Sequence, residues 1–133
     1  PRQEVLAAAL ECLLDAGCDV NQAANNGHTP AYVAAQEGQT AALAILVKAP
    51  GFDVDKVTEG GRTPAYIAAL NGHAAALALL VKAGCDVDQA NNNGATPVYI
   101  AAQGGQMAAL EILIKANCDV NQANDNGYTP AYV

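Results

Sequence analysis

The chain has 133 residues, of which 52% are apolar and only 5% aromatic, and its formal net charge is −7 at pH 7. With six Lys and Arg residues in all, it lacks the basic surface that nucleic-acid binding requires. No apolar run approaches the roughly 18 residues of a membrane span, and no signal-peptide pattern opens the sequence. We therefore expect an intracellular, cytoplasmic protein without membrane insertion.

A phrase of about a dozen residues recurs along the chain. It reads NGHTPAYVAAQEG from residue 26, GGRTPAYIAALNG from residue 60 and NGATPVYIAAQGG from residue 93, and it returns as NGYTPAYV at the end. The Thr-Pro pairs begin at Thr29, Thr63, Thr96 and Thr129, so the copies are spaced by 34, 33 and 33 residues, with Pro50 as the extra residue. In chain order, the predicted units are residues 1–24, 25–57, 58–90, 91–123 and 124–133.

The first complete unit predicts two short helices. Thr29 can cap a helix that begins with proline, so a first helix is expected over Pro30–Glu37. Gly38 follows, where a chain that leaves a helix needs positive φ. A second helix is expected over about Thr40–Lys48, with a lysine at the negative end of the helix dipole. Later units repeat these positions at Gly72, Gly105, Lys82 and Lys115.

Helices of eight or nine residues are marginal alone, because isolated helices need roughly 12–15 residues. Pairs of alanines in the predicted first helices allow close packing against the next unit: Ala34-Ala35, Ala68-Ala69 and Ala101-Ala102. The sequence therefore predicts one all-α domain over residues 1–133, a solenoid in which each unit is stabilised by its neighbours.

The turn after each second helix carries an aspartate at the same position: Asp19, Asp53, Asp86 and Asp119. Further carboxylates follow two residues later at Asp55 and Asp88. A calcium loop would need more oxygen ligands at set spacing, and Asn21 and Asn121 replace the second carboxylate in the outer units. We expect the turn aspartates to accept backbone N–H bonds, and we expect no metal site.

We also interpret the cysteine side chains as structural. Cys18, Cys85 and Cys118 precede Asp-Val at one repeated position, and Cys12 lies in an apolar stretch. We predict four free thiols that act as small buried hydrophobes, as expected in a reducing compartment.

Neither histidine is placed for catalysis. His28 shares its position with Arg62, Ala95 and Tyr128, a pattern typical of a variable exposed site. His73 shares its position with Gln39 and Gln106, which favours a hydrogen-bonding side chain and not an imidazole. The sequence predicts no enzyme, no catalytic residue and no cofactor.

Several of these motifs together resemble the ankyrin-repeat family. The family has the successive motifs T-P-L-H-x-A-A, G-H, L-L and G-A-D-V-N. At the same places this chain has TPAYVAA, then Gly-Gln or Gly-His, an apolar second helix and GCDVN. The resemblance covers essentially the whole chain and implies about four helix-turn-helix repeats, with hairpin-like loops projecting at right angles. The chain departs from the family at T-P-L-H, where it has Ala or Val followed by Tyr, at Tyr32, Tyr66, Tyr99 and Tyr132. We interpret these tyrosines as structural.

The ends do not coincide with unit boundaries. The first unit lacks its first half, and the last stops five residues into a predicted helix. We favour a fragment of a longer array. The alternative is end-to-end association through the terminal units, in which Leu6, Leu10, Leu13 and Leu14 would meet another copy.

The resemblance implies a non-enzymatic protein-binding or scaffolding module that grips a partner with its loop tips and concave first-helix face. The partner's identity is not predicted. Positions that differ between units supply the candidate contacts: Asn25, Asn26, His28, Gln36, Glu37, Glu59, Arg62, Leu70, Asn71, Asn92, Asn93, Gln103, Asp125, Asn126 and Tyr128. Aromatic and arginine side chains dominate interface hot spots, so Tyr128, His28, Arg62 and Leu70 are the best anchors.

Overall fold

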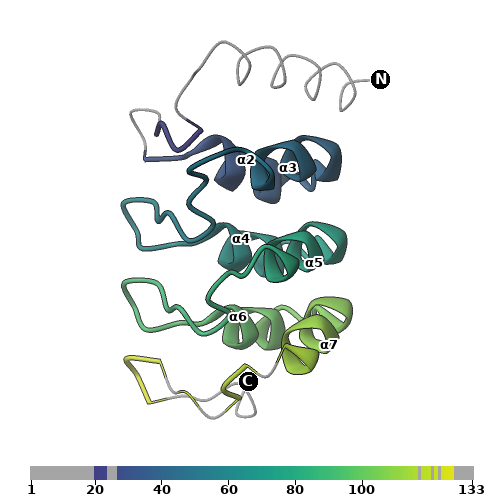
Figure 1. The fold of residues 1–133 in the computed structure, drawn as a ribbon. Helices are drawn as coiled ribbons and strands as arrows, with labels where there is room; N and C mark the ends of the chain where they lie inside the picture. The colour runs from purple at the N-terminus through teal and green to yellow at the C-terminus, as the bar shows by residue number, and fades with distance from the viewer. Residues whose placement is uncertain (1–19, 24–26, 117, 121, 123, 128–133) are drawn as a thin grey trace.

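A computed structural model of the protein describes residues 20–23, 27–116, 118–120, 122 and 124–127. In this part of the chain six α-helices stack in pairs (Figure 1). Their bounds are α2 Pro30–Glu37, α3 Thr40–Val47, α4 Pro64–Leu70, α5 Ala74–Lys82, α6 Pro97–Gln103 and α7 Met107–Lys115.

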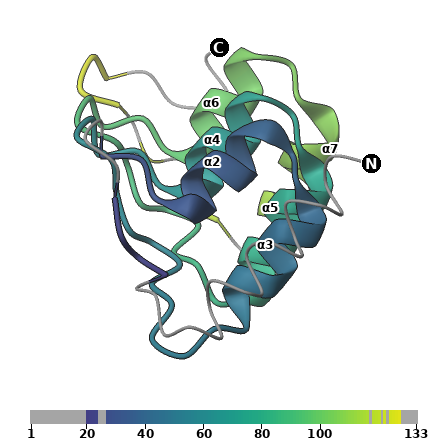
Figure 2. The ribbon, with the colours of Figure 1, turned by 90° about the horizontal axis from the view of Figure 1, so that it is seen from above.

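The helices form two layers with hairpin-like loops on one side. The first helices of the units make one layer, in which α4 packs between α2 and α6, and the second helices make the other, in which α5 packs between α3 and α7 (Figure 2). The loops project to one side of the stack at each level (Figure 1). The predicted all-α solenoid is confirmed.

Each first helix begins at the predicted cap. The Oγ atoms of Thr29, Thr63 and Thr96 accept hydrogen bonds from the backbone N–H three residues later, at 3.1–3.3 Å. These bonds satisfy donors that have no partner within the helix, and the proline that follows suits the first helical position. The predicted positive φ at the end of the first helix is also confirmed, for instance at Gly38 with φ 68°.

The second helices follow the prediction within a residue. α3 ends at Val47, so Lys48 is its cap residue, whereas Lys82 and Lys115 lie in the last turns of α5 and α7. These cations interact favourably with the negative ends of their helices.

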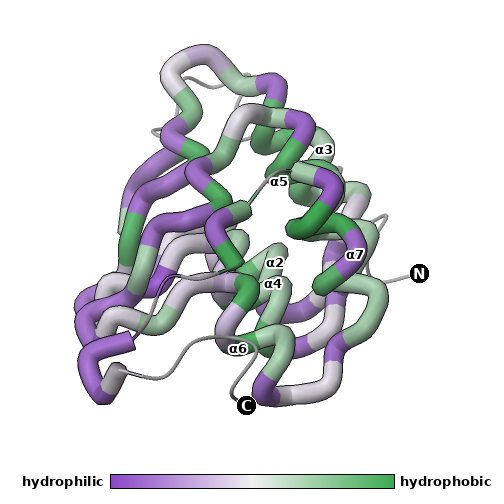
Figure 3. Tube along the Cα trace, turned by 90° about the horizontal axis from the view of Figure 1, so that it is seen from below, coloured by the Kyte–Doolittle hydropathy of each residue, from purple (hydrophilic) through white to green (hydrophobic). Residues whose placement is uncertain are grey.

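The core consists of small and aliphatic side chains. Leu43, Leu77, Leu80 and Leu113 are fully buried, as are most of the paired alanines, although Ala102 is only half-buried. Hydrophobic residues follow the helices, and the loops are largely hydrophilic (Figure 3). Because alanine has no side chain beyond Cβ, adjacent helices can approach closely enough to bury one another's short hydrophobic faces.

The turns after the second helices are bonded within and between units. The Oδ1 atoms of Asp53 and Asp86 accept from the backbone N–H two residues later, each at 3.0 Å, as predicted. The sequence did not indicate the second set of bonds, which joins neighbouring units. Asn21 accepts from the N–H of Asp53 at 2.9 Å and Asp55 from that of Asp86 at 3.0 Å.

Asp88 continues this series by accepting from the N–H of Asp119 at 2.6 Å. The carboxylates that could have suggested a calcium loop are thus bound to main-chain donors. We call these bonds, made by Asn21, Asp55 and Asp88, the turn ladder. None of the described helices has the length and apolar character needed to cross a membrane.

Candidate partner-binding surface

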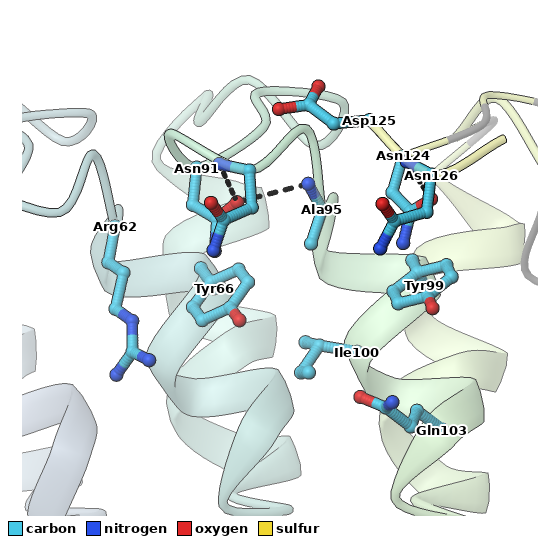
Figure 4. A pocket seen from close by; sticks show the side chains of 11 residues that line it. Arg62, Tyr66, Asn91, Ala95, Tyr99, Ile100, Gln103, Asn124, Asp125 and Asn126 are labelled. Carbon is cyan, nitrogen blue, oxygen red and sulfur yellow. Dashed lines mark hydrogen bonds between the residues drawn. The ribbon is translucent and has the colours of Figure 1, made fainter. Parts of the chain in front are cut away.

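The hairpins beside the first helices are held by short-range hydrogen bonds. The N–H of Thr58 donates to the carbonyl of Arg62 at 3.0 Å, and that of Asn91 donates to the carbonyl of Ala95 at 2.9 Å. In the second of these hairpins the side-chain oxygen of Asn91 also accepts from the N–H groups of Asn93 and Ala95 (Figure 4). An asparagine that closes its own turn in this way fixes the hairpin without help from a partner.

Backbone bonds also join one hairpin to the next. The N–H of Asn92 donates to the carbonyl of Gly60, and that of Asp125 donates to the carbonyl of Asn93, both at 3.0 Å. The Asn92 side chain adds a bond to the carbonyl of Glu59 at 3.0 Å. The hairpins therefore form a continuous edge beside α4 and α6, and they do not act as independent loops.

In two of the units, the side chain four positions before the tyrosine contacts the tyrosine ring. The ring of His28 lies 4.5 Å from that of Tyr32, and the guanidinium of Arg62 lies 5.3 Å from the centre of the Tyr66 ring. Our interpretation of this position as exposed is wrong, because His28 and Arg62 are half-buried and Ala95 is buried. The tyrosine rings provide a surface on which the side chains pack, and that contact removes them from water.

The prediction that these tyrosines are structural is confirmed for Tyr32, Tyr66 and Tyr99, which are all buried, whereas Tyr132 lies outside the described residues. Burial raises the pKa of the Tyr66 hydroxyl above its usual value, although the nearby Arg62 charge opposes this shift. The ring therefore stays neutral at pH 7, which is the form that attracts a cation to its face.

In the described part of the chain, a larger and a smaller hollow lie between the hairpins and the first helices. The larger has a volume of about 470 Å³ and lies beside α4 and α6 (Figure 4). Its lining is rich in amide side chains and contains Arg62, Tyr66, Asn91, Asn93, Ala95, Tyr99, Ile100, Gln103, Asn124, Asp125 and Asn126. The smaller hollow, of about 280 Å³, repeats the arrangement one unit earlier and is lined by His28, Tyr32, Thr58, Glu59, Gly60 and Arg62.

The structure brings many of the predicted contact residues to these hollows. Five predicted contact residues line the larger hollow: Arg62, Asn93, Gln103, Asp125 and Asn126. Three line the smaller hollow, which shares Arg62 with the larger one: His28, Glu59 and Arg62. Gln36, Glu37, Leu70 and Asn71 lie at the ends of α2 and α4, where the Asn71 side chain donates to the carbonyl of Gln36 at 3.1 Å. Asn25, Asn26 and Tyr128 lie outside the described residues.

Sequence comparison between units missed several lining residues. Tyr99 belongs to the position that we interpret as structural, and Ile100 follows it. Asn91 and Asn124 directly precede the variable positions chosen as candidate contacts. A signal was available at Ala95, where a small residue replaces His28 and Arg62 of the earlier units. It marks a place where the surface is hollowed.

Two of the predicted thiols, Cys85 and Cys118, lie among the described residues. Burial raises the pKa of the Cys85 thiol to about 12, and the pKa of Cys118 is raised for the same reason. Both are free thiols, and at pH 7 they are protonated and poor nucleophiles. Over residues 20–23, 27–116 and the described positions beyond, no group of three or more His, Cys, Asp or Glu side chains could hold a metal ion.

Comparison with known proteins agrees with this architecture. The family model described as "Ankyrin repeats (3 copies)" matches residues 4–91 and 78–133, which together span nearly the whole chain. A search of curated proteins found no match.

Proposed function

This chain belongs to the ankyrin-repeat family, and on that premise we propose that it is a non-enzymatic module that binds a protein partner along its hairpins and concave first-helix face. Ankyrin repeats generally mediate protein–protein interaction. The observation that carries the proposal for this chain is the hollow of about 470 Å³, because five of the predicted contact residues line it.

The chemistry of this surface favours a polypeptide as the partner. Its amide side chains can both donate and accept hydrogen bonds, as a peptide backbone requires. The hydrogen bonds within and between the hairpins hold the surface in place, so little ordering cost accompanies binding. Free thiols at Cys85 and Cys118 support a reducing, cytoplasmic setting.

The test compares two charged variants with the same number of substitutions. The concave variant carries Asn93→Arg and Gln103→Arg, and the control carries Ala75→Arg and Ala78→Arg on α5, in the layer of second helices. All four side chains are exposed, so each variant should fold, which circular dichroism and urea unfolding would verify.

Proteins captured from the native cell extract would then be quantified by mass spectrometry with wild-type chain and both variants as bait. We expect at least one partner to fall more than tenfold with the concave variant and to remain with the control. Partners that respond only to the α5 variant, or to neither, would show that the concave face is not the binding surface.

A second candidate function is assembly through the ends of the stack, at one of which α7 is the last described helix. On α7, Met107 is 68% exposed and Ile114 is 55% exposed, and apolar side chains of this size favour contact with another surface. Light scattering over a range of concentrations tests this candidate. Self-association should raise the mass with concentration, and Met107→Glu with Ile114→Glu should return it to that of a monomer. A mass that stays monomeric throughout excludes this function.

A further inference from the structure

The tyrosine positions show a regular contact that is interrupted once. In the first two hairpins, His28 lies against Tyr32 and Arg62 lies over Tyr66. In the third hairpin the equivalent residue is Ala95, whose methyl group cannot extend across the Tyr99 ring. The larger hollow lies at this point, and it is lined by both Ala95 and Tyr99.

The hollow lies where the missing side chain would extend from position 95. Ala95 lies between Tyr66 and Tyr99, with Ile100 below Ala95 and Gln103 below Tyr99 (Figure 4). Arg62 occupies the corresponding place beside Tyr66 one unit earlier (Figure 4). A long side chain that entered beside Ala95 could therefore contact Tyr99 as Arg62 contacts Tyr66.

The charges around the hollow favour a cation. Asp125 is among the lining residues, with its carboxylate at the outer edge of the hollow (Figure 4), and the chain as a whole carries a net charge of −7. The only cation in the lining, Arg62, already lies over Tyr66. Amide oxygens of asparagine and glutamine side chains are acceptors for N–H donors, and Ile100 supplies an apolar contact for an aliphatic stem.

We propose that this hollow receives an arginine side chain of the protein partner, which takes the place beside Ala95 and stacks on Tyr99. This inference rests on the proposed function and specifies the chemistry of the partner at one point. Arginine suits the site better than lysine because its planar, weakly hydrated guanidinium stacks on a ring and donates in several directions to amide and carboxylate oxygens.

The experiment uses N-acetyl-arginine methylamide as the probe. It is titrated into the isotopically labelled full chain, and NMR follows the signals of Ala95, Tyr99 and Ile100. We expect saturable shifts centred on these three residues. N-acetyl-citrulline methylamide has nearly the same shape without the charge and should bind at least tenfold more weakly.

Two variants locate the binding. Ala95→Arg supplies the missing side chain from within the chain and should weaken probe binding at least tenfold, whereas Ala78→Arg on α5 adds the same charge elsewhere and should change it less than twofold. Absence of saturable shifts, equal binding of citrulline, or unchanged binding to A95R would each overturn the proposal.

The same variants separate this inference from the function on which it rests. In one outcome the probe does not bind, and the captured partner is lost with the concave variant of the previous subsection but retained with A95R. The concave face then binds a partner that places no arginine in this hollow. If capture is unaffected by both variants, the proposed binding surface itself is wrong.

Discussion

At the scale of single residues, Gly61 and Gly84 have similar backbone conformations in different surroundings. Their φ angles are +77° and +88°. A Cβ atom at Gly61 would overlap the side-chain oxygen of Asn92 and lie 2.9 Å from its backbone N, whereas a Cβ at Gly84 would meet nothing within 4 Å. Gly84 is needed only because its φ is positive. Gly61 is needed for its positive φ and also because the next hairpin approaches it closely.

Alanine substitutions should separate these two requirements. We expect Gly84→Ala to cost about 1–2 kcal/mol of unfolding free energy, the usual penalty of the left-handed region. Gly61→Ala should cost a further 1–3 kcal/mol or so, because the backbone N of Asn92 must move and its bond to Gly60 is disturbed. Urea unfolding of both variants measures the difference, and equal losses would contradict close hairpin contact at Gly61.

A residue-scale prediction also follows from the helix caps. Thr63 is fully buried and its Oγ accepts from the N–H of Tyr66 at 3.1 Å. Thr63→Ala should lower the unfolding free energy by about 1 kcal/mol because the capped N–H loses its acceptor. Thr63→Ser keeps the hydroxyl and serves as the control. A serine variant as unstable as the alanine variant would assign the loss to the methyl group.

At the scale of the elements, the turn ladder has asparagine at position 21 and aspartate at the equivalent position 55, and the effect of this difference on stability can be tested. Asn21 both accepts from the N–H of Asp53 and donates to the carbonyl of Gly51 at 2.8 Å, whereas Asp55 can only accept. Asp55→Asn should therefore gain a bond to the carbonyl of Gly84 and raise the unfolding free energy by about 0.5–1.5 kcal/mol at pH 7. Asp55→Ala, which has no acceptor, should lower it by about 1 kcal/mol.

The pH dependence of this effect has a defined sign. Burial raises the pKa of the Asp55 carboxyl above 3.8, assisted by the charges of Asp86 and Asp53 and opposed by the bond from the Asp86 N–H. A raised pKa in the folded state gives stability that is complete below pH 3.8 and is lost as the pH rises through the folded value. The advantage of D55N over wild type should thus grow from pH 3 to pH 7. An advantage independent of pH would show that the carboxyl pKa is not raised.

The elements also show what sequence reasoning could and could not supply. The bounds of α2, the caps at Thr29, Thr63 and Thr96 and the positive φ of Gly38 depend on residues close in sequence, and they were predicted within a residue. The turn ladder joins residues 31 or 32 positions apart, so single-unit signals could not indicate it. The hollow beside Tyr99 escaped prediction because it results from a small residue, Ala95, at a position assumed to be exposed.

At the scale of the whole molecule, stability should follow position in the stack. The α4–α5 pair has described neighbours on both sides, since α4 contacts α2 and α6, and α5 contacts α3 and α7. In solenoids each unit is stabilised mainly by the neighbours it contacts. We expect the amide hydrogens of α4 and α5 to exchange most slowly with deuterium and those of α7 faster. Equal protection in all six helices would mean that the stack opens only as a whole.

The turn ladder also has a consequence for how such a chain changes over generations. Each of its bonds joins a side chain of one unit to a main-chain N–H of the next, a group that every residue except proline carries. The donor therefore survives most mutations at its own position, while the acceptor tolerates exchange between aspartate and asparagine. Duplication of the gene segment for residues 58–90 would supply both partners of a new bond in a single event. Longer chains can arise from this one by copying alone, before selection has acted on any new contact.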